Sequence, residues 1–166
     1  MSKTKDILGR LSVLSAKSKD ANKQYFSNLN KRQKRDLDNV VHELHQEVFA
    51  ETDCLECANC CKSLGPRIIM KDIERIAKSQ RMKESDFVEK YLRIDEDGDY
   101  VFKSMPCPFL ASDNYCLIYD FRPKACREYP HTDRTKFLQI ANLTITNSAT
   151  CPAVYEILER LRGMNR

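Results

Sequence analysis

Apolar residues recur at three- and four-residue spacing after Asn30, which is the pattern of a helix with one buried face. The positions in this stripe are Leu37, Val40, Val41, Leu44 and Val48. Asn30 can cap this helix, and Gln33 stands where a capping box places its second residue. Upstream, a second set of apolar positions indicates a shorter helix: Ile7, Leu8, Leu11 and Leu14. We therefore predict a helical N-terminal part.

Short strands and helices are predicted in the middle of the chain. Residues 67–70 favour a short strand, and residues 72–79 have the apolar spacing of a helix. Ser85 can cap a further helix. Asp97-Gly98 lies between two stretches of strand-forming residues, Arg93-Ile94 and Tyr100–Phe102. This arrangement predicts a β-hairpin.

The C-terminal part is predicted to hold a strand and then a helix. Residues 137–146 are rich in β-branched side chains, which favour a strand. The last helix is expected to run from Pro152 to about Arg162 and to end at Gly163. The predicted fold class is α+β: a small, helix-rich domain with short strands and an N-terminal helical extension. We place the extension at residues 1–49 and the domain at residues 50–166.

Charge is concentrated at the N-terminal end. Residues 1–50 hold 10 basic and 6 acidic residues, so this part carries the whole formal net charge of +4. The densest basic run, Lys31 to Arg35, is soon interrupted by Asp36 and Asp38. This favours a solvated helix face, and a nucleic-acid partner is not expected. No apolar run is long enough to span a membrane and no secretory signal is evident, so we expect a cytoplasmic protein.

Eight cysteines are the most informative feature of the sequence. They are Cys54, Cys57, Cys60, Cys61, Cys107, Cys116, Cys126 and Cys151. In a reducing compartment such a set binds metal more often than it forms disulfides. All 6 prolines lie within five residues of a cysteine, and proline stiffens a loop by fixing φ. This coincidence favours a preorganised metal site.

The spacing of the cysteines leaves the number of sites open. Two residues between Cys54 and Cys57 allow one tight turn to aim both sulfurs at one ion. Cys60 and Cys61 are adjacent, and neighbouring side chains point apart, so we expect either two nearby sites or one ligand beside a packing thiol. Cys151 is expected at the N-cap of the last helix, where the helix favours a thiolate: it is a ligand or, if free, reactive.

Other candidate chemistry is weaker. His42 and His45 are one residue short of the HExxH zinc motif, so we interpret them as packing residues. Arg122, Lys124 and Arg127 lie close to Cys126 in the sequence and could offset thiolate charge. Neither a nucleotide-binding glycine loop nor a G-x-S-x-G elbow is present. An enzyme built on this sequence would have to use the metal centre itself.

These motifs together resemble the CxxCxxCC family of YkgJ-type cysteine-cluster proteins. The matching stretches are CLECANCC from Cys54, CPFL from Cys107, the segment from Cys116 to Pro130, and Cys151-Pro152. The resemblance covers about residues 50–155. It implies that seven cysteines bind zinc, iron or an iron–sulfur cluster: Cys54, Cys57, Cys60, Cys61, Cys107, Cys116 and Cys126. Cys151 is implied as an eighth ligand.

The sequence is compatible with three functions. The first is a metal-binding protein that holds zinc or iron, as ions or as an iron–sulfur cluster, through cysteine thiolates. The second is an oxidoreductase that depends on iron or on an iron–sulfur cluster. The third is a protein that binds a partner or a nucleic acid and contains a structural zinc core. All-sulfur sites suit both metals, so the ligands alone do not choose between zinc and iron.

Overall fold

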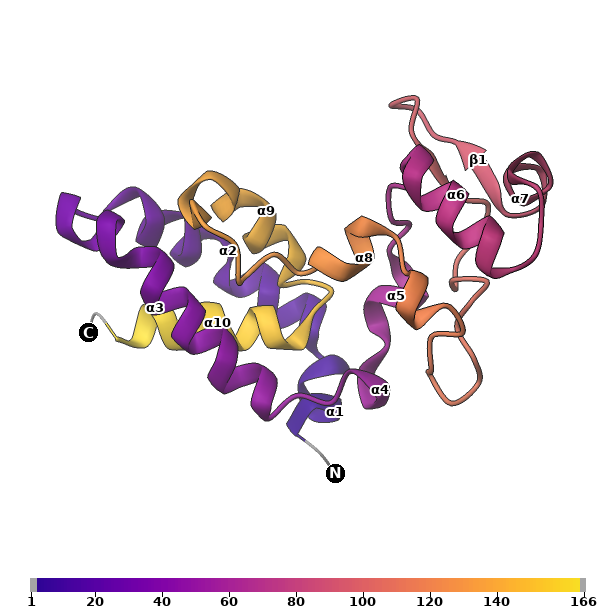
Figure 1. Ribbon diagram of the computed structural model, residues 1–166. Helices are drawn as coiled ribbons and strands as arrows, with labels where there is room; N and C mark the ends of the chain where they lie inside the picture. Colours follow the sequence, from indigo (N-terminus) through magenta and orange to yellow (C-terminus); the bar gives the residue numbers. More distant parts are fainter. Residues whose placement is uncertain (1–2, 165–166) are drawn as a thin grey trace. The chain divides into compact units, whose positions relative to one another are not determined.

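The computed structural model describes residues 3–164 and is mostly helical (Figure 1). Its only sheet in these residues has two strands, which confirms the predicted helix-rich α+β class. In chain order the elements are α1 (Lys3–Leu8), α2 (Leu11–Ser27), α3 (Lys31–Ala50), α4 (Cys54–Cys57), α5 (Asn59–Ser63), α6 (Met70–Ser79), α7 (Glu84–Tyr91), β1 (Leu92–Ile94), β2 (Tyr100–Phe102), η1 (Tyr119–Phe121), α8 (Lys124–Glu128), η2 (Phe137–Ile140), α9 (Ala141–Asn147) and α10 (Pro152–Gly163).

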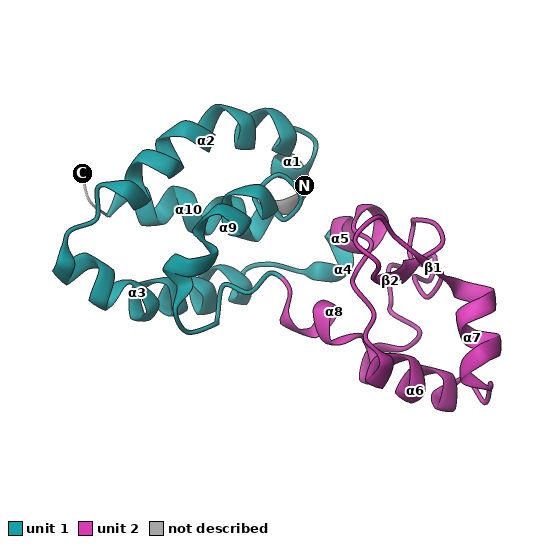
Figure 2. Ribbon diagram, turned by 90° about the horizontal axis from the view of Figure 1, so that it is seen from above, with its two compact units in different colours: residues 1–57, 130–166 teal, residues 58–129 magenta. Residues whose placement is uncertain are grey.

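The chain forms two units, coloured separately in Figure 2. Unit 1 combines residues 1–57 with residues 130–166, and unit 2 consists of residues 58–129. The first and last parts of the chain thus share one unit, a grouping that differs from the predicted extension and domain. None of the helices within residues 3–164 is long and apolar enough to cross a lipid bilayer.

Unit 1 is held together by the apolar stripe predicted for α3. Leu37, Val41, Leu44 and Val48 are buried in one core with Val154, Ile157, Leu158 and Leu161 of α10. The predicted capping box is confirmed. The side chain of Asn30 accepts a hydrogen bond from the backbone N–H of Gln33 (2.9 Å). In return, the side chain of Gln33 accepts one from the backbone N–H of Asn30 (2.9 Å). These bonds satisfy N–H groups at the start of α3.

The strand predicted at residues 137–146 is wrong, because this segment forms η2 and α9. Phe137 and Ile145 are buried in the unit 1 core, and the Thr144 hydroxyl donates to the carbonyl of Ile140, the N-cap residue of α9. Burial of apolar side chains outweighs a β preference that amounts to only about 1 kcal/mol across residue types. The prediction for α10 is confirmed: it begins at Pro152, although Gly163 is its last residue instead of following it.

Unit 2 has a core of its own, built around the predicted hairpin. Strands β1 and β2 pair antiparallel, with Leu92 opposite Phe102, and Gly98 in the turn has φ +81°. Residues 67–70 give only one isolated bridge, between Ile68 and Tyr100, before α6 begins. The N-cap of α7 is Lys83, so the predicted cap at Ser85 is wrong.

Candidate metal centre

The eight cysteines divide between the two units, and all of them are free thiols. Unit 1 contains Cys54, Cys57 and Cys151, and unit 2 contains Cys60, Cys61, Cys107, Cys116 and Cys126. The boundary between the units falls directly after Cys57, inside the cluster. The two groups are therefore described separately.

Backbone hydrogen bonds bring the cysteine-bearing segments of unit 2 together. The N–H of Cys107 donates to the carbonyl of Cys61 at 2.8 Å, which joins the loop after β2 to α5. Leu110 forms an antiparallel bridge with Cys116, and the N–H of Leu117 donates to Phe109 at 2.9 Å. Three cysteines that are distant in sequence are thus fixed in one region of the unit.

Cys60 and Cys61 lie in α5, and their Sγ atoms are 4.0 Å apart. The two sulfurs are in contact, so the expectation that they point apart is wrong. Hydrogen bonding to Cys60 is the main reason that the pKa of Cys61 falls to about 7. Arg122 and Lys62 lower this pKa further, whereas burial opposes them. Cys61 is therefore the unit 2 thiol whose surroundings most favour a thiolate among those with resolved pKa shifts.

The other three thiols of this group have raised pKa values, mainly because they are buried. Burial raises the pKa of Cys107 to about 11 and that of Cys126 to about 12, and it also raises the pKa of Cys116. In all three cases the nearby charge of Cys61 adds to the increase. The four sulfurs are thus close enough to feel one another's charge.

Three cysteines, two in unit 2 and one in unit 1, share the same local arrangement of backbone amides. In each, the backbone N–H of a residue two or three positions further along the chain acts on the sulfur and lowers the thiol pKa. The amides belong to Phe109 and Leu110 at Cys107, to Ile118 at Cys116, and to Ala153 and Val154 at Cys151. Such amides favour the thiolate form that metals bind.

The unit 1 group is built around the N-cap of α10, where Cys151 lies as predicted. Burial raises the pKa of Cys151 to about 11, and the negative charges of Cys57 and Cys54 raise it too. The two amides of α10 act in the opposite direction but are outweighed. The helix N-terminus therefore does not by itself make Cys151 a thiolate, because the thiol is removed from water.

Arg122 is a cation that acts on three of the unit 2 thiols. It lowers the pKa of Cys61, Cys116 and Cys126. Its guanidinium carbon lies 3.6 Å from the centre of the Tyr119 ring, and its Nε donates to the Tyr119 carbonyl at 2.7 Å. This side chain is therefore held in place beside the sulfurs. The sequence suggested its role through proximity to Cys126, and the structure extends it to two further thiols.

The donor chemistry of these groups fits zinc or iron, because both metals accept all-sulfur coordination. Within residues 3–164, no three Cys, His, Asp or Glu side chains are already arranged to hold one ion. Burial favours the protonated form of Cys107, Cys116 and Cys126. A cation would reverse this, since a coordinating thiol loses its proton.

His45 shows the packing role predicted for the histidines of α3. Its Nδ1 lies 2.7 Å from the hydroxyl of Thr132, and its ring centre is 4.5 Å from that of Phe49. His42 bonds through Nε2 to the carbonyl of Arg134 at 3.0 Å. Each ring thus has a partner within unit 1.

Comparison with protein families supports the same conclusion. A family model described as "Putative zinc- or iron-chelating domain" matches residues 53–152, which is more than half of the chain. The chain belongs to the CxxCxxCC family. The match runs from the residue before Cys54 to the residue after Cys151, so all eight cysteines lie inside it. No curated protein and no solved structure gave a match.

Proposed function

We propose that this CxxCxxCC protein binds zinc or iron and that Cys61, Cys107, Cys116 and Cys126 hold one ion in unit 2. The proposal is supported by the backbone bonds that join the segments of Cys61, Cys107 and Cys116. It is also supported by the charge of Cys61, which raises the pKa values of Cys107, Cys116 and Cys126 in addition to burial. Four sulfurs satisfy a tetrahedral site. Cys54, Cys57 and Cys151 form a second group of ligands, consistent with the charges of Cys57 and Cys54 that raise the pKa of Cys151.

Bound metal would supply a cross-link and would neutralise charge. It would join α5, the two loops at Cys107 and Cys116, and α8, which are far apart along the chain. Because the ligands come together only in the folded chain, free energy of metal binding becomes free energy of folding. Arg122 then lies where it offsets the excess negative charge of four thiolates. We infer a closed, structural site from this donor set.

An iron–sulfur centre that serves an oxidoreductase is the second candidate. It is favoured by the backbone amides that lower the pKa values of Cys107, Cys116 and Cys151, because amides that face sulfur tune the reduction potential of such clusters. A nucleic-acid role is disfavoured by the ion pairs of the basic run. Arg32 and Arg35 both pair with Asp36, at 3.8 and 3.2 Å, which reduces the local positive charge.

Elemental analysis of the anaerobically purified full chain, with an ultraviolet–visible spectrum, tests the proposal. Zinc or iron without labile sulfide supports the thiolate-held ion. Iron with acid-labile sulfide and broad visible absorption supports the cluster instead. A protein that takes up neither zinc nor iron under reducing conditions would contradict both. Reducing conditions matter because oxidised cysteines do not ligate, and for the same reason we propose a cytoplasmic location.

The grouping of the ligands is tested with double substitutions. Cys107→Ser and Cys126→Ser remove ligands of the same proposed ion, so the double variant should lose no more metal than either single variant. Cys107→Ser combined with Cys151→Ser affects both groups, and the two losses should add. Equal losses in both double variants would mean that the four unit 2 thiols do not form a separate site.

A further inference from the structure

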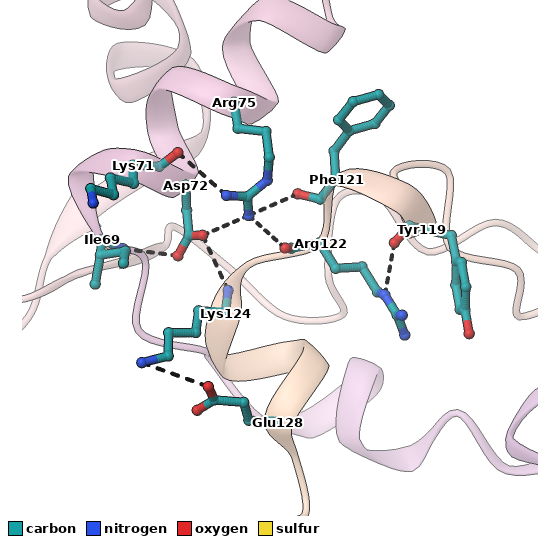
Figure 3. A network of polar contacts seen from close by, with 9 residues as sticks. All are labelled: Ile69, Lys71, Asp72, Arg75, Tyr119, Phe121, Arg122, Lys124 and Glu128. Atoms are coloured by element: carbon teal, nitrogen blue, oxygen red, sulfur yellow. Dashed lines mark hydrogen bonds and ion pairs between the residues drawn. The ribbon is translucent and has the colours of Figure 1, made fainter.

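Asp72 of α6 is a buried carboxylate whose hydrogen bonds all serve one junction of unit 2 (Figure 3). Its side chain is only 1% exposed. It accepts from the backbone N–H of Ile69 at 3.2 Å, from that of Lys124 at 3.1 Å and from Nη2 of Arg75 at 2.6 Å. The bond to Ile69 satisfies the start of α6, and the bond to Lys124 satisfies the start of α8.

Arg75 extends this network to the segment that leads into α8. Its Nη2 also donates to the carbonyl of Arg122 at 2.7 Å and lies 3.4 Å from the carbonyl of Phe121. The carboxylate of Asp72 and the guanidinium of Arg75 therefore hold the two sides of the turn at Pro123, one through an N–H and the other through carbonyls. Figure 3 shows both contacts reaching from α6 to this turn.

The turn that is held in this way belongs to the cysteine cluster. It connects Cys116 to Cys126, and Cys126 is the third residue of α8, the helix whose first residue is bonded to Asp72. It also carries Arg122, the cation beside the thiols. A shift of this turn would move one sulfur and the compensating charge together.

We propose that Asp72 and Arg75 are positioning residues for the metal site of unit 2, because they set where Cys126 and Arg122 lie relative to the other three thiols. This inference rests on the proposed function. A buried ion pair is by itself weak evidence for stability, and the distinguishing feature of this one is that its bonds reach the segment 121–124. Every hydrogen bond of this pair to the segment 121–124 ends on backbone atoms, which fixes the path of the chain.

Arg75→Gln tests the inference, and Arg160→Gln is its matched control. The two arginine side chains are 29% and 28% exposed, and both form ion pairs. Arg160 pairs with Glu47, Glu51 and Glu156 inside unit 1, which contains none of the four proposed ligands. Zinc affinity of the full chain is measured by competition with a chelator in a Cys151→Ser background, which removes a ligand of the unit 1 group so that the unit 2 site is read by itself. We expect Arg75→Gln to lower the affinity of the unit 2 site about tenfold or more.

A second readout separates positioning from general loss of stability. Cobalt(II) loaded in place of zinc reports ligand geometry through its visible spectrum, which should change in Arg75→Gln and stay as in the wild type in Arg160→Gln. Arg75→Lys should have a zinc affinity and a cobalt spectrum close to those of Arg75→Gln, because an ammonium lacks the planar fork that reaches a carboxylate and carbonyls together. Circular dichroism establishes that each variant is folded before it is compared.

Asp72→Asn keeps the shape of the side chain and removes its charge, and we expect the same direction of change. If this variant does not fold, Arg75→Gln decides the question. A folded Arg75→Gln protein with wild-type affinity and cobalt spectrum would overturn the inference, as would equal losses in Arg75→Gln and Arg160→Gln. A wild-type chain that binds no metal would overturn the proposed function itself, which is a different result.

Discussion

The Sγ atoms of Cys60 and Cys61 lie 4.0 Å apart. Burial is the main reason that the pKa values of Cys107, Cys116 and Cys126 are raised, and the charge of Cys61 adds to the increase at all three. We propose that these two adjacent thiols have different roles. Four sulfurs complete a tetrahedral site, so Cys60 is not needed for the ion that Cys61 helps to hold.

We predict that Cys60→Ser keeps the ion of unit 2 and that Cys61→Ser loses it. The measurement is metal content in two backgrounds. Adding Cys126→Ser to Cys60→Ser should remove the unit 2 ion, because the site is still intact in the single variant. Adding it to Cys61→Ser should remove nothing more, because that site was already lost. If the reverse pattern is found, Cys60 is the ligand and Cys61 is its neighbour.

The capping box of α3 gives a prediction about stability. Asn30→Ala removes the side-chain oxygen that accepts the N–H of Gln33 and leaves that donor without its protein partner. We expect a loss of about 1 kcal/mol in the free energy of unfolding, measured by urea denaturation. Lys31→Ala is the control, since it changes the first residue of the same helix and leaves both capping bonds in place. Equal losses in the two variants would contradict a capping role.

The hairpin of unit 2 depends on one backbone conformation. Gly98 has φ +81°, and a Cβ added there meets no atom within 4 Å, so the cost of Gly98→Ala is conformational and not steric crowding. We expect a loss of about 1–2 kcal/mol. Gly65→Ala is the control, because its Cβ also has open space and its backbone lies outside the left-handed region. That variant should be neutral or slightly more stable. Thermal unfolding of both variants checks this contrast.

The elements that the sequence predicted correctly are those with local determinants. The capping box at Asn30, the Asp97-Gly98 turn and Pro152 at the start of α10 each act within a few residues of the chain. The strand assigned to residues 137–146 failed because its β-branched side chains are recruited into a core that the chain builds from remote helices. Such burial is invisible to local propensity.

The candidate site was predictable in composition but not in grouping. The motifs identified the eight cysteines and the family, yet the spacing left open which thiols lie together. Only the fold places Cys107 beside Cys61 through a backbone bond. Asp72 gave a weaker signal: an acidic residue three positions after Ile69 suggests a helix start, but nothing in the sequence connects it to Lys124.

His45 provides a prediction about pH. Burial lowers its pKa below 6.5, and His42 lowers it further, whereas Asp133 raises it. The ring also lies against Phe49 and bonds to the buried hydroxyl of Thr132. The unfolded chain therefore binds a proton at His45 more readily than the folded chain does. The contribution of this histidine to stability is complete above its unfolded pKa and is lost as pH falls through 6.5 toward the folded pKa.

We therefore expect the urea midpoint of the wild type to fall between about pH 7.5 and about pH 5 more steeply than that of His45→Gln, which has no proton to gain there. Near pH 7.5 the variant should be the less stable protein, because it loses the ring contact with Phe49 and the geometry of the bond to Thr132. The difference between the two proteins should shrink as the pH falls. Parallel midpoints over this range would show that protonation of His45 does not contribute to the acid sensitivity of unit 1.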